Sequence, residues 1–372
     1  MKAKVSLVRC DNYTSVLVQE ATRKAVDSLG GVSRFIRPQS RVLVKPNLLM
    51  AIEPEKGVTT HPEVVRAVIK ILKDIDCRIL VGDGPSVWGK QIENVDEVYR
   101  RTGIRRVCEE EGVSLVEFDK RRMRGKFPLA AILDECDFLV NVPKLKTHGL
   151  TLLTGALKNL FGLVPGTFKT ELHKRFYGRQ DFCGILVDIF QEVLPALTVV
   201  DGIVAMEGEG PGTSGRLRDL HLLLAGPDAV ALDSVMALIM GLAPLDIPTT
   251  KEAFQRGLGC ADIHSIEILG SELRQVMGKP FLLPSSSIKK IISKPIFKLA
   301  AKFIRYYPCV EQERCTACMA CIKACPEEII RLHQERIVID YTKCIACFCC
   351  QECCPASAIK LKKSLLAKLI GL

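Results

Sequence analysis

Short apolar runs and longer amphipathic stretches alternate along the first three quarters of the chain. The helical spacing of apolar positions predicts helices over residues 14–29, 62–73, 181–193 and 227–240. The short runs are rich in Val, Ile and Leu, are bounded by Gly, Pro, Asp or Asn, and predict eight strands: KVSLV, RVLVKPN, CRILVGD, VSLVEF, DFLVNVPK, ALTVVDG, HLLLAG and IEILG. This alternation is typical of βαβ units. We therefore expect an α/β fold with a mainly parallel sheet that helices cover on both faces.

Eight cysteines near the end of the chain fall in two copies of one spacing. The copies are CTACMACIKACP and CIACFCCQECCP, and each reads C-x2-C-x2-C-x3-C-P. Bacterial ferredoxins use this run, in which three thiolates hold one [4Fe–4S] cluster and the fourth binds the other cluster. The spacing therefore predicts a unit with two [4Fe–4S] clusters as cofactors, one held by Cys315, Cys318, Cys321 and Cys354 and the other by Cys344, Cys347, Cys350 and Cys325.

Three other roles compete for these cysteines: disulfides, zinc ligation and packing as inert thiols. The chain opens with no signal-peptide pattern and holds no apolar run long enough to span a membrane, so we expect a cytoplasmic protein whose thiols stay reduced. Zinc sites usually pair two C-x2-C knuckles that a longer segment separates, without a third cysteine and a C-x3-C-P tail. Cys309, Cys349 and Cys353 lie beside the predicted ligands and are alternative ligands.

The length of the chain and an LPSSS linker signal predict more than one domain. We expect an α/β domain over residues 1–282, a basic linker over 283–308, a small α+β ferredoxin-like domain over 309–358 and a basic amphipathic tail over 359–372. Residues 285–372 carry 15 Lys and Arg against 7 Asp and Glu, which accounts for 8 of the net charge of +10. The linker and the tail are each either a strap that packs on a domain or an amphipathic helix that meets an acidic partner or an anionic membrane surface. No nucleic-acid motif accompanies them, so we expect no nucleic-acid partner.

Polar residues recur where the predicted strands end, which is where parallel α/β sheets bind ligands. PKLKTH is predicted to be a loop that brings together three candidate catalytic residues, Lys144, Lys146 and His148. Among these, His148 is the candidate for proton transfer, because the unperturbed pKa of histidine lies nearest neutrality. The candidate residues for binding an anionic ligand are Lys45, Asn47, His61, Asp83, Lys158 and Asn159. All nine are expected to converge on one cleft that opens toward the cysteine-rich domain, and no Walker loop or G-x-G-x-x-G run supports a nucleotide there.

Several stretches of the α/β part resemble one protein family. They are VLVKPNLL, TTHPEVVRAVI, VGDGPS, LVNVPKLKTHGLTLLTGALKNLFGLVPG, LTVVDGIVAMEGEGPG and PDAVALDSV, and together they cover roughly residues 40–270. In this order they resemble the domain of unknown function 362 family, whose members often end in a ferredoxin-like unit. The resemblance implies the architecture and no particular reaction. The cysteine runs depart from common ferredoxin patterns at Ala317, where a glycine is often seen, and in the extra cysteines.

Two functions from different classes follow from these patterns. The first is an iron–sulfur electron-transfer protein, in which two clusters relay single electrons to or from a site in the α/β domain, with a redox partner protein or a small-molecule substrate as partner. The second is a non-redox protein that binds an anionic metabolite and uses the clusters as structural supports. Reversible reduction of the clusters would distinguish the first function from the second.

Overall fold

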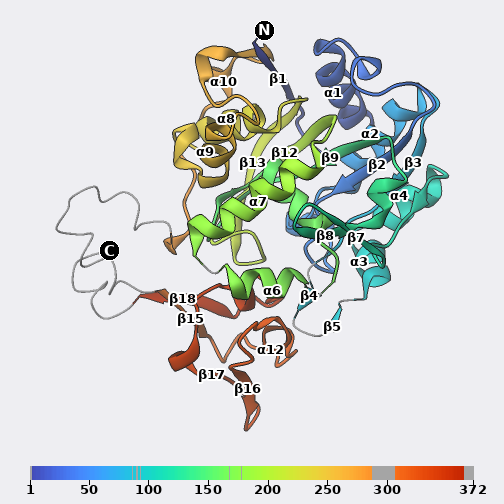
Figure 1. The fold of residues 1–372 in the computed structure, drawn as a ribbon. Helices are drawn as coiled ribbons and strands as arrows, with labels where there is room; N and C mark the ends of the chain where they lie inside the picture. The colour runs from blue at the N-terminus through green and yellow to red at the C-terminus, as the bar shows by residue number, and fades with distance from the viewer. Residues whose placement is uncertain are drawn as a thin grey trace.

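The computed structural model describes residues 2–85, 87–88, 91–92, 94–166, 168–176, 178–286 and 306–363. Figure 1 shows a large α/β part that contains the N-terminus and a small C-terminal part beneath it, with α6 between α7 and the small part. The predicted linker falls mainly on residues 287–305 and the end of the predicted tail on residues 364–372, and both stretches lie outside the described residues. Their roles stay predictions.

Ten strands of the described chain form the central sheet, in the order β14-β1-β13-β12-β9-β2-β3-β6, with β10 beside β12 and β11 beside β10. Neighbours run parallel, except that β13 is antiparallel to β1 and β12, and β11 is antiparallel to β10. The bounds are β1 (Ala3–Arg9), β2 (Arg41–Pro46), β3 (Arg78–Val81), β6 (Ser114–Leu115), β9 (Phe138–Val142), β10 (Lys144–His148), β11 (Leu152–Thr154), β12 (Leu197–Gly208), β13 (Gly215–Gly226) and β14 (Ile266–Gly270). The predicted mostly parallel α/β sheet is therefore confirmed.

Helices cover both faces of this sheet, as predicted. They are α1 (Ser15–Ser28), α2 (Pro62–Lys73), α3 (Val95–Arg101), α4 (Ile104–Glu110), α5 (Ala156–Asn159), α6 (Phe168–Arg175), α7 (Arg179–Val193), α8 (Ala229–Ile239), α9 (Pro248–Gln255) and α10 (Leu273–Val276). Two short hairpins complete this part: β4 (Val87–Trp88) with β5 (Gln91–Ile92), and β7 (Arg121–Arg124) with β8 (Phe127–Ala130).

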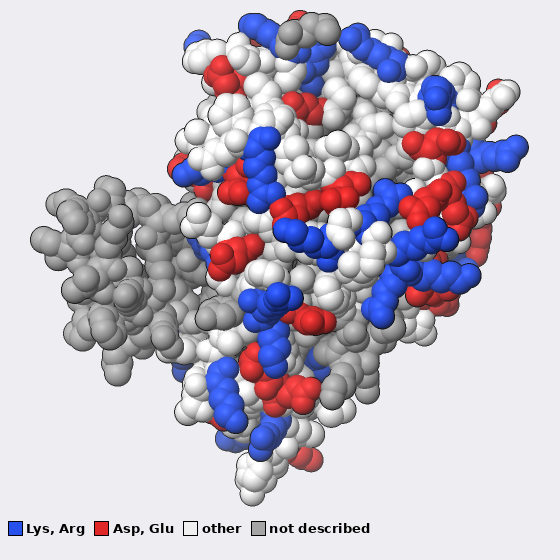
Figure 2. Space-filling view, in the orientation of Figure 1, with Lys and Arg blue, Asp and Glu red and all other residues white. Residues whose placement is uncertain are grey.

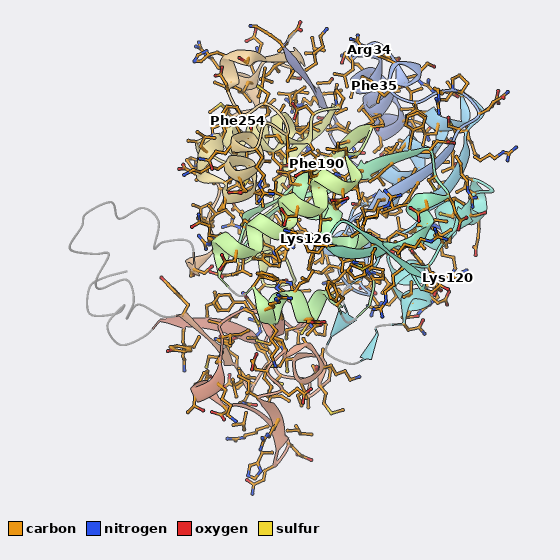
Figure 3. The ribbon with its side chains drawn as sticks, viewed as in Figure 1. Arg34, Phe35, Lys120, Lys126, Phe190 and Phe254 are labelled. Atoms are coloured by element: carbon orange, nitrogen blue, oxygen red, sulfur yellow. The ribbon has the colours of Figure 1, made fainter. Side chains whose placement is uncertain are left out.

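The alternation of side chains along β2 explains the two layers of helices. Val42 and Val44 are fully buried in a core with residues of α1, α2 and α4, whereas Leu43 between them is buried in a core with residues of α7. Successive side chains of a strand point to opposite faces, so a run that is apolar at every position needs cover on both sides. Phe190, labelled on α7 in Figure 3, is buried in the second of these cores.

One predicted loop is a strand. PKLKTH was expected to be a loop because its lysines, threonine and histidine are polar, but Lys144–His148 form β10, which pairs with β12 and β11. All five residues of β10 are buried. Local propensity fails here because buried partners elsewhere in the chain satisfy the polar side chains, and this compensation cannot be seen in the local sequence.

The small C-terminal part is built from two similar halves. Its elements are β15 (Tyr306–Val310), α12 (Ala320–Ala324), β16 (Ile330–His333), β17 (Arg336–Ile339), α13 (Cys349–Glu352) and β18 (Ile359–Lys363). β15 pairs with β18 and β16 pairs with β17, both antiparallel. Because β15 and β18 pair with each other across the predicted bounds of 309–358, the described residues 306–363 are treated together. We refer to residues 306–363 as the cysteine-rich unit.

The described cysteine-rich unit is almost neutral when its charged residues are counted. Of the 15 basic residues after position 285, seven lie outside the described chain, which leaves 8 Lys and Arg against 7 Asp and Glu in residues 306–363. Figure 2 accordingly shows basic and acidic side chains interspersed on its visible face. The predicted basic character therefore belongs to the linker and the tail. Within the described residues, no helix is long and apolar enough to cross a bilayer.

Candidate functional site

The cysteine-rich unit packs against loops that follow the strands of the central sheet. Thr213, in the turn between β12 and β13, donates a hydrogen bond from Oγ1 to the carbonyl oxygen of Cys354 at 2.5 Å. Ser357 Oγ donates to the carbonyl oxygen of Thr213 at 2.8 Å. The backbone of Glu352 lies so close to Gly212 that a Cβ at position 212 would collide with it. The two parts thus fit together closely at this turn.

A cavity of about 80 Å³ lies between the α/β part and the cysteine-rich unit. Its α/β wall comes from the segments after β2 and β3 and from the stretch that runs from β11 to α6. The facing wall consists of Ala324 from α12 and Cys349 and Glu352 from α13. The residues on the α/β side are Asn47, Leu48, Leu49, Asp83, Gly84, Thr154, Lys158, Asn159, Phe161, Gly162, Lys169, Thr170 and His173. The cavity therefore lies at the carboxyl ends of parallel strands, where ligands of this fold class bind.

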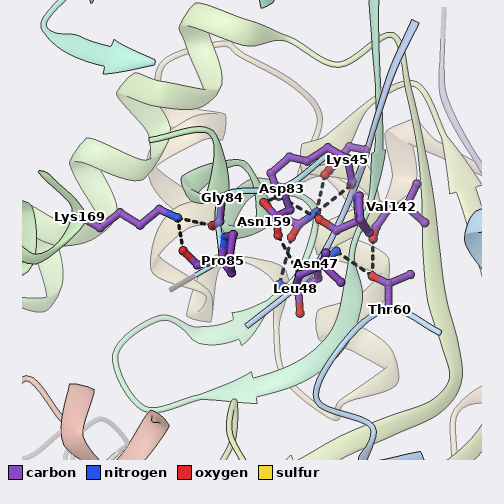
Figure 4. Close-up of polar contacts among 12 residues, drawn as sticks. Lys45, Asn47, Leu48, Thr60, Asp83, Gly84, Pro85, Val142, Asn159 and Lys169 are labelled. Carbon is purple, nitrogen blue, oxygen red and sulfur yellow. Dashed lines mark hydrogen bonds and ion pairs between the residues drawn. The ribbon is translucent and has the colours of Figure 1, made fainter. Parts of the chain in front are cut away.

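A buried ion pair fixes the segment after β2 against the segment after β3. Lys45 Nζ lies 2.7 Å from Asp83 Oδ1, and Lys45 and Asp83 are both almost fully buried. The backbone N–H of Leu48 donates to Asp83 Oδ2 at 2.8 Å (Figure 4). Burial lowers the pKa of Lys45, while the nearby Asp83 carboxylate opposes that shift. A Cβ at Gly162 would overlap this pair, so only glycine fits there without displacement.

Two asparagines extend this network, and Figure 4 shows the contact between them. Asn47 Nδ2 donates to Asn159 Oδ1 at 3.1 Å, and Asn47 Oδ1 accepts a hydrogen bond from Lys146 Nζ at 2.8 Å. Lys146 also donates to the carbonyl oxygen of Val58 at 2.7 Å. Burial lowers the pKa of Lys146 well below its usual range, and the Lys158 ammonium adds to that shift. Lys146 thus lies behind the cavity wall and orients Asn47.

His148 is fully buried at the end of β10 and faces the cysteine-rich unit. Its Nδ1 accepts hydrogen bonds from the backbone N–H groups of Leu150 and Thr151 at 3.0 and 3.2 Å. This arrangement assigns the proton of the neutral ring to Nε2, which lies 3.3 Å from Glu352 Oε1 but has no hydrogen-bond partner among the described residues. Burial, followed by the charge of Lys158, lowers the pKa of His148 well below its usual value.

The cavity carries two cations on its α/β side. Lys169 donates from Nζ to the carbonyl oxygens of Gly84 and Pro85, and burial lowers its pKa to about 7 (Figure 4). Lys158 Nζ has no hydrogen-bond or ion-pair partner among the described residues and lies 5.9 Å from the centre of the Phe161 ring. The ammonium of Lys158 also lowers the pKa of Lys45, Lys146, His148, Lys169 and His173. The charge of Lys158 therefore acts on most of the titratable groups around the cavity.

Two predicted site residues belong to a different polar cluster. Lys144 Nζ contacts Asp201 Oδ2 at 2.8 Å and Tyr13 OH at 2.6 Å. The ring of His61 stacks on Tyr13 with 3.7 Å between the ring centres, and the backbone N–H of His61 donates to Asp201. Neither Lys144 nor His61 lines the cavity. The expectation of a single cleft for all nine residues is therefore corrected, because Lys144 and His61 are held by Asp201, which lies opposite Lys144 on the neighbouring strand β12.

The nine predicted residues thus divide into three groups. Four line the cavity, three lie directly behind its wall, and two belong to the cluster around Asp201. The groups are Asn47, Asp83, Lys158 and Asn159; Lys45, Lys146 and His148; and Lys144 and His61.

Five polar lining residues were not singled out from the sequence: Thr154, Lys169, Thr170, His173 and Glu352. Lys169 and His173 lie on α6, away from any strand end, so the strand-end rule could not find them. Glu352 lies between two cysteines of the second run. An acidic residue inside a cysteine run that is expected to be buried is a sequence signal that could have drawn attention to Glu352.

The cysteines of the two runs gather in two sets. Cys325, Cys344, Cys347 and Cys350 line one cavity of about 20 Å³. Burial raises the pKa of the Cys321 thiol to about 12, and nearby Cys354, Cys318 and Cys315 contribute to the rise, which shows that these four are neighbours. The two sets have the same members as the two ligand sets predicted from the spacing. Among the described residues, no group of three or more His, Cys, Asp or Glu side chains is arranged to hold a single metal ion.

The backbone follows the same path in both cysteine runs. Ala317 and Met319 flank Cys318 with φ of 51° and 61°, and Ala346 and Phe348 flank Cys347 with φ of 53° and 64°. These left-handed conformations explain why a glycine would suit position 317. Backbone N–H groups also approach the sulfurs: Ala358 donates to Cys354 Sγ at 3.2 Å. The repeated loop is thus shaped to turn thiols inward.

Comparisons with known proteins place the chain in a family. Residues 42–238 match the family described as domain of unknown function (DUF362). A thylakoid-associated protein of Synechocystis sp. is 33% identical over 265 residues, which cover 69% of this chain and 81% of that protein. A solved structure of the lactate racemase apoprotein from Thermoanaerobacterium thermosaccharolyticum aligns with a TM-score of 0.41 and 11% identity over 65% of this chain and 58% of that one, too distant to carry function over. The extent of the first two matches shows that this chain belongs to the DUF362 family.

Proposed function

We propose that this protein is an iron–sulfur electron-transfer protein in which two [4Fe–4S] clusters exchange single electrons with a ligand in the cavity. The observation that carries the proposal is the composition of the cavity wall. One wall carries Lys158 and Lys169, and the facing wall carries Cys349 and Glu352, which belong to the second cysteine run. A ligand in this cavity would therefore lie against the residues that surround a predicted cluster.

The cysteines fit the proposed clusters in number, grouping and environment. Four thiols line the 20 Å³ cavity, and four others form the set around Cys321. In each set, one thiol comes from the opposite run, Cys325 in the first and Cys354 in the second, which is the crossing that two-cluster ferredoxins require. Backbone N–H groups near Cys325 and Cys354 would stabilise thiolates over thiols. When bound, such clusters supply or accept one electron each.

The exposure of the cysteines indicates which proposed cluster would face a partner protein and which would face the ligand. Cys318 is exposed, whereas Cys347, Cys349 and Cys350 are buried. Cys349 lines the 80 Å³ cavity between the two parts, and its neighbours Cys347 and Cys350 line the 20 Å³ cavity. The set with Cys318 would therefore meet a redox partner protein at the surface. The set with Cys347 would exchange electrons with the ligand.

The second candidate function is the binding of an anionic metabolite without electron transfer, with the clusters as structural supports. The observation in its favour is Lys158, an ammonium in the cavity without a partner among the described residues. This function needs the cavity but does not need clusters that change oxidation state.

Anaerobic purification followed by iron and sulfide analysis and a dithionite titration tests the proposal. Eight thiolates complete two four-iron sites, so we expect about eight irons per chain and an electron paramagnetic resonance signal that appears on reduction and disappears on reoxidation. Zinc in place of iron, or at most one cluster, would contradict the proposal. Two clusters that collapse on reduction would favour the metabolite-binding function.

A further inference from the structure

The geometry points to a short carboxylic acid with a hydrogen-bond donor at its other end, such as a small hydroxy acid, as the ligand of the cavity between the α/β part and the cysteine-rich unit. The inference deepens the proposed function, since it names the class of molecule that would face the clusters. It depends on the size of the cavity, its charge, two polar groups without partners, and the chemistry of the opposite wall.

The size of the cavity favours a small ligand. Its volume is about 80 Å³ of space accessible to a water-sized sphere. One water needs on the order of 10–15 Å³ on this measure, so the cavity holds about six non-hydrogen atoms. An oxyanion or a short organic acid fits within this space, whereas a nucleoside phosphate or a flavin would extend beyond it.

The charge of the cavity favours an anion. The charged side chains that line it are Lys158, Lys169, Asp83 and Glu352. Directly behind the wall are Lys45, which is paired with Asp83, and Lys146, which is bound to Asn47. Four lysines against two carboxylates leave a formal excess of two positive charges. A bound carboxylate would reduce this excess in a site that is partly shielded from water.

Two polar groups on the α/β wall are available to an anionic ligand. Lys158 Nζ has no hydrogen-bond or ion-pair partner among the described residues. Thr154 is 3% exposed, and its Oγ1 is buried without a hydrogen-bond partner in the part of the chain that the structure describes. Thr154 lies at the end of β11 and Lys158 one turn into the segment that follows. A carboxylate between them would accept a charge-assisted hydrogen bond from Lys158 and a second from Thr154.

The facing wall determines which way the ligand lies. Glu352 presents a carboxyl group that accepts hydrogen bonds from hydroxyl or amino groups of a ligand. Ala324 and Cys349 beside it offer small, weakly polar surfaces that suit a short carbon chain. The acid group therefore lies toward Lys158, and the donor group lies toward the cysteine-rich unit.

Calorimetric titration of the iron-loaded protein under anaerobic conditions tests the inference. The probes are glycolate, its isostere propionate, inorganic phosphate and ADP. We expect glycolate to bind more tightly than propionate and ADP not to bind. Lys158→Met should weaken glycolate binding at least about tenfold and Thr154→Val a few-fold, while Lys251→Met, which removes an exposed lysine on α9, should leave it unchanged.

Two outcomes overturn the inference, and one separates it from the proposed function. Glycolate and propionate that fail to bind, or that bind equally to wild type and to both cavity variants, show that the cavity is not a carboxylate site. Binding of phosphate alone shows that the ligand is an inorganic oxyanion. If glycolate binding depends on Lys158 and Thr154 in a protein whose clusters cannot be reduced, the inference holds and the electron-transfer proposal fails.

Discussion

Glu352 Oε1 lies 3.3 Å from His148 Nε2, so a carboxyl group from the cysteine-rich unit meets a fully buried imidazole at the end of β10. The two residues are 204 positions apart in the chain and come from its two parts. Glu352 also lines the cavity, whereas His148 lies behind it. The contact ties the position of a cavity-lining group to the docking of the cysteine-rich unit.

This relationship predicts that Glu352 selects the ligand by its donor group. In Glu352→Ala, we expect the preference for glycolate over propionate to disappear, because no carboxyl group remains to accept a hydrogen bond from the ligand hydroxyl. Calorimetry with both acids measures this preference. Glu313→Ala, at an exposed position of the same unit, is the control and should retain it. A preference that survives in Glu352→Ala contradicts the proposed orientation.

The crossing of the fourth ligand predicts the effect of replacing Cys325. In Cys325→Ser, we expect about half of the iron to be lost, because Cys325 shares a site with Cys344, Cys347 and Cys350. The resonance spectrum of the reduced variant should match that of Cys344→Ser and differ from that of Cys354→Ser. Cys260→Ser, outside both runs, should keep the full iron content. A Cys325→Ser spectrum that matches Cys354→Ser instead would refute the crossing.

The buried Lys45–Asp83 pair predicts a large loss of stability when one partner is removed. Lys45→Met should lower the free energy of unfolding by about 3–5 kcal/mol, because it leaves the Asp83 carboxylate buried without its counter-charge. Denaturant unfolding measures this loss, and the double variant Lys45→Met, Asp83→Leu should be less destabilised. Lys4→Met breaks the exposed pair with Glu267 and should cost less than about 1 kcal/mol. Equal losses in Lys45→Met and Lys4→Met would show that the buried pair is not important for the fold.

The shifted pKa of Lys169 predicts how ligand binding depends on pH. Burial lowers the pKa of Lys169 to about 7, so its ammonium loses its proton as the pH rises from 6 to 9. The groups that surround it are Asp83, Lys45 and Lys158, and His173, with a pKa near 3, stays neutral over this range. Because only the protonated lysine attracts an anion, affinity for glycolate should fall by about tenfold across this interval. Lys169→Met should flatten the dependence, and an unchanged slope in that variant would contradict the assignment.

The sequence predicted the sheet well because most of its strands consist largely of apolar residues, and that composition indicates that they are buried. The run VLV at residues 42–44 is apolar at every position, and that pattern suits a strand covered on both faces. β10 was missed because most of its residues are polar, so its composition does not indicate that it is buried. Lys144 and Lys146 are fully buried in it, and their burial depends on Asp201 in β12 and on Asn47 and Val58 in the connection between β2 and α2.

The same limit applies to the candidate site. The strand-end rule found Asn47, Asp83, Lys158 and Asn159, because a parallel sheet brings such residues together wherever they lie in the sequence. It could not separate Lys144 and His61 from them, since that separation depends on the contacts of both residues with Asp201, which lies on β12. The wall that carries Cys349 and Glu352 depends on how two parts of the chain dock, and neither periodicity nor spacing describes docking.

The resonance spectrum of the reduced, eight-iron protein, recorded with and without glycolate, tests most directly whether the clusters and the cavity work together. We predict that glycolate changes the signal of the cluster held by Cys344, Cys347, Cys350 and Cys325, leaves the other signal unchanged, and has no effect in Lys158→Met. If glycolate binds and both signals stay the same, the ligand does not meet the clusters, and electron transfer through this cavity is contradicted.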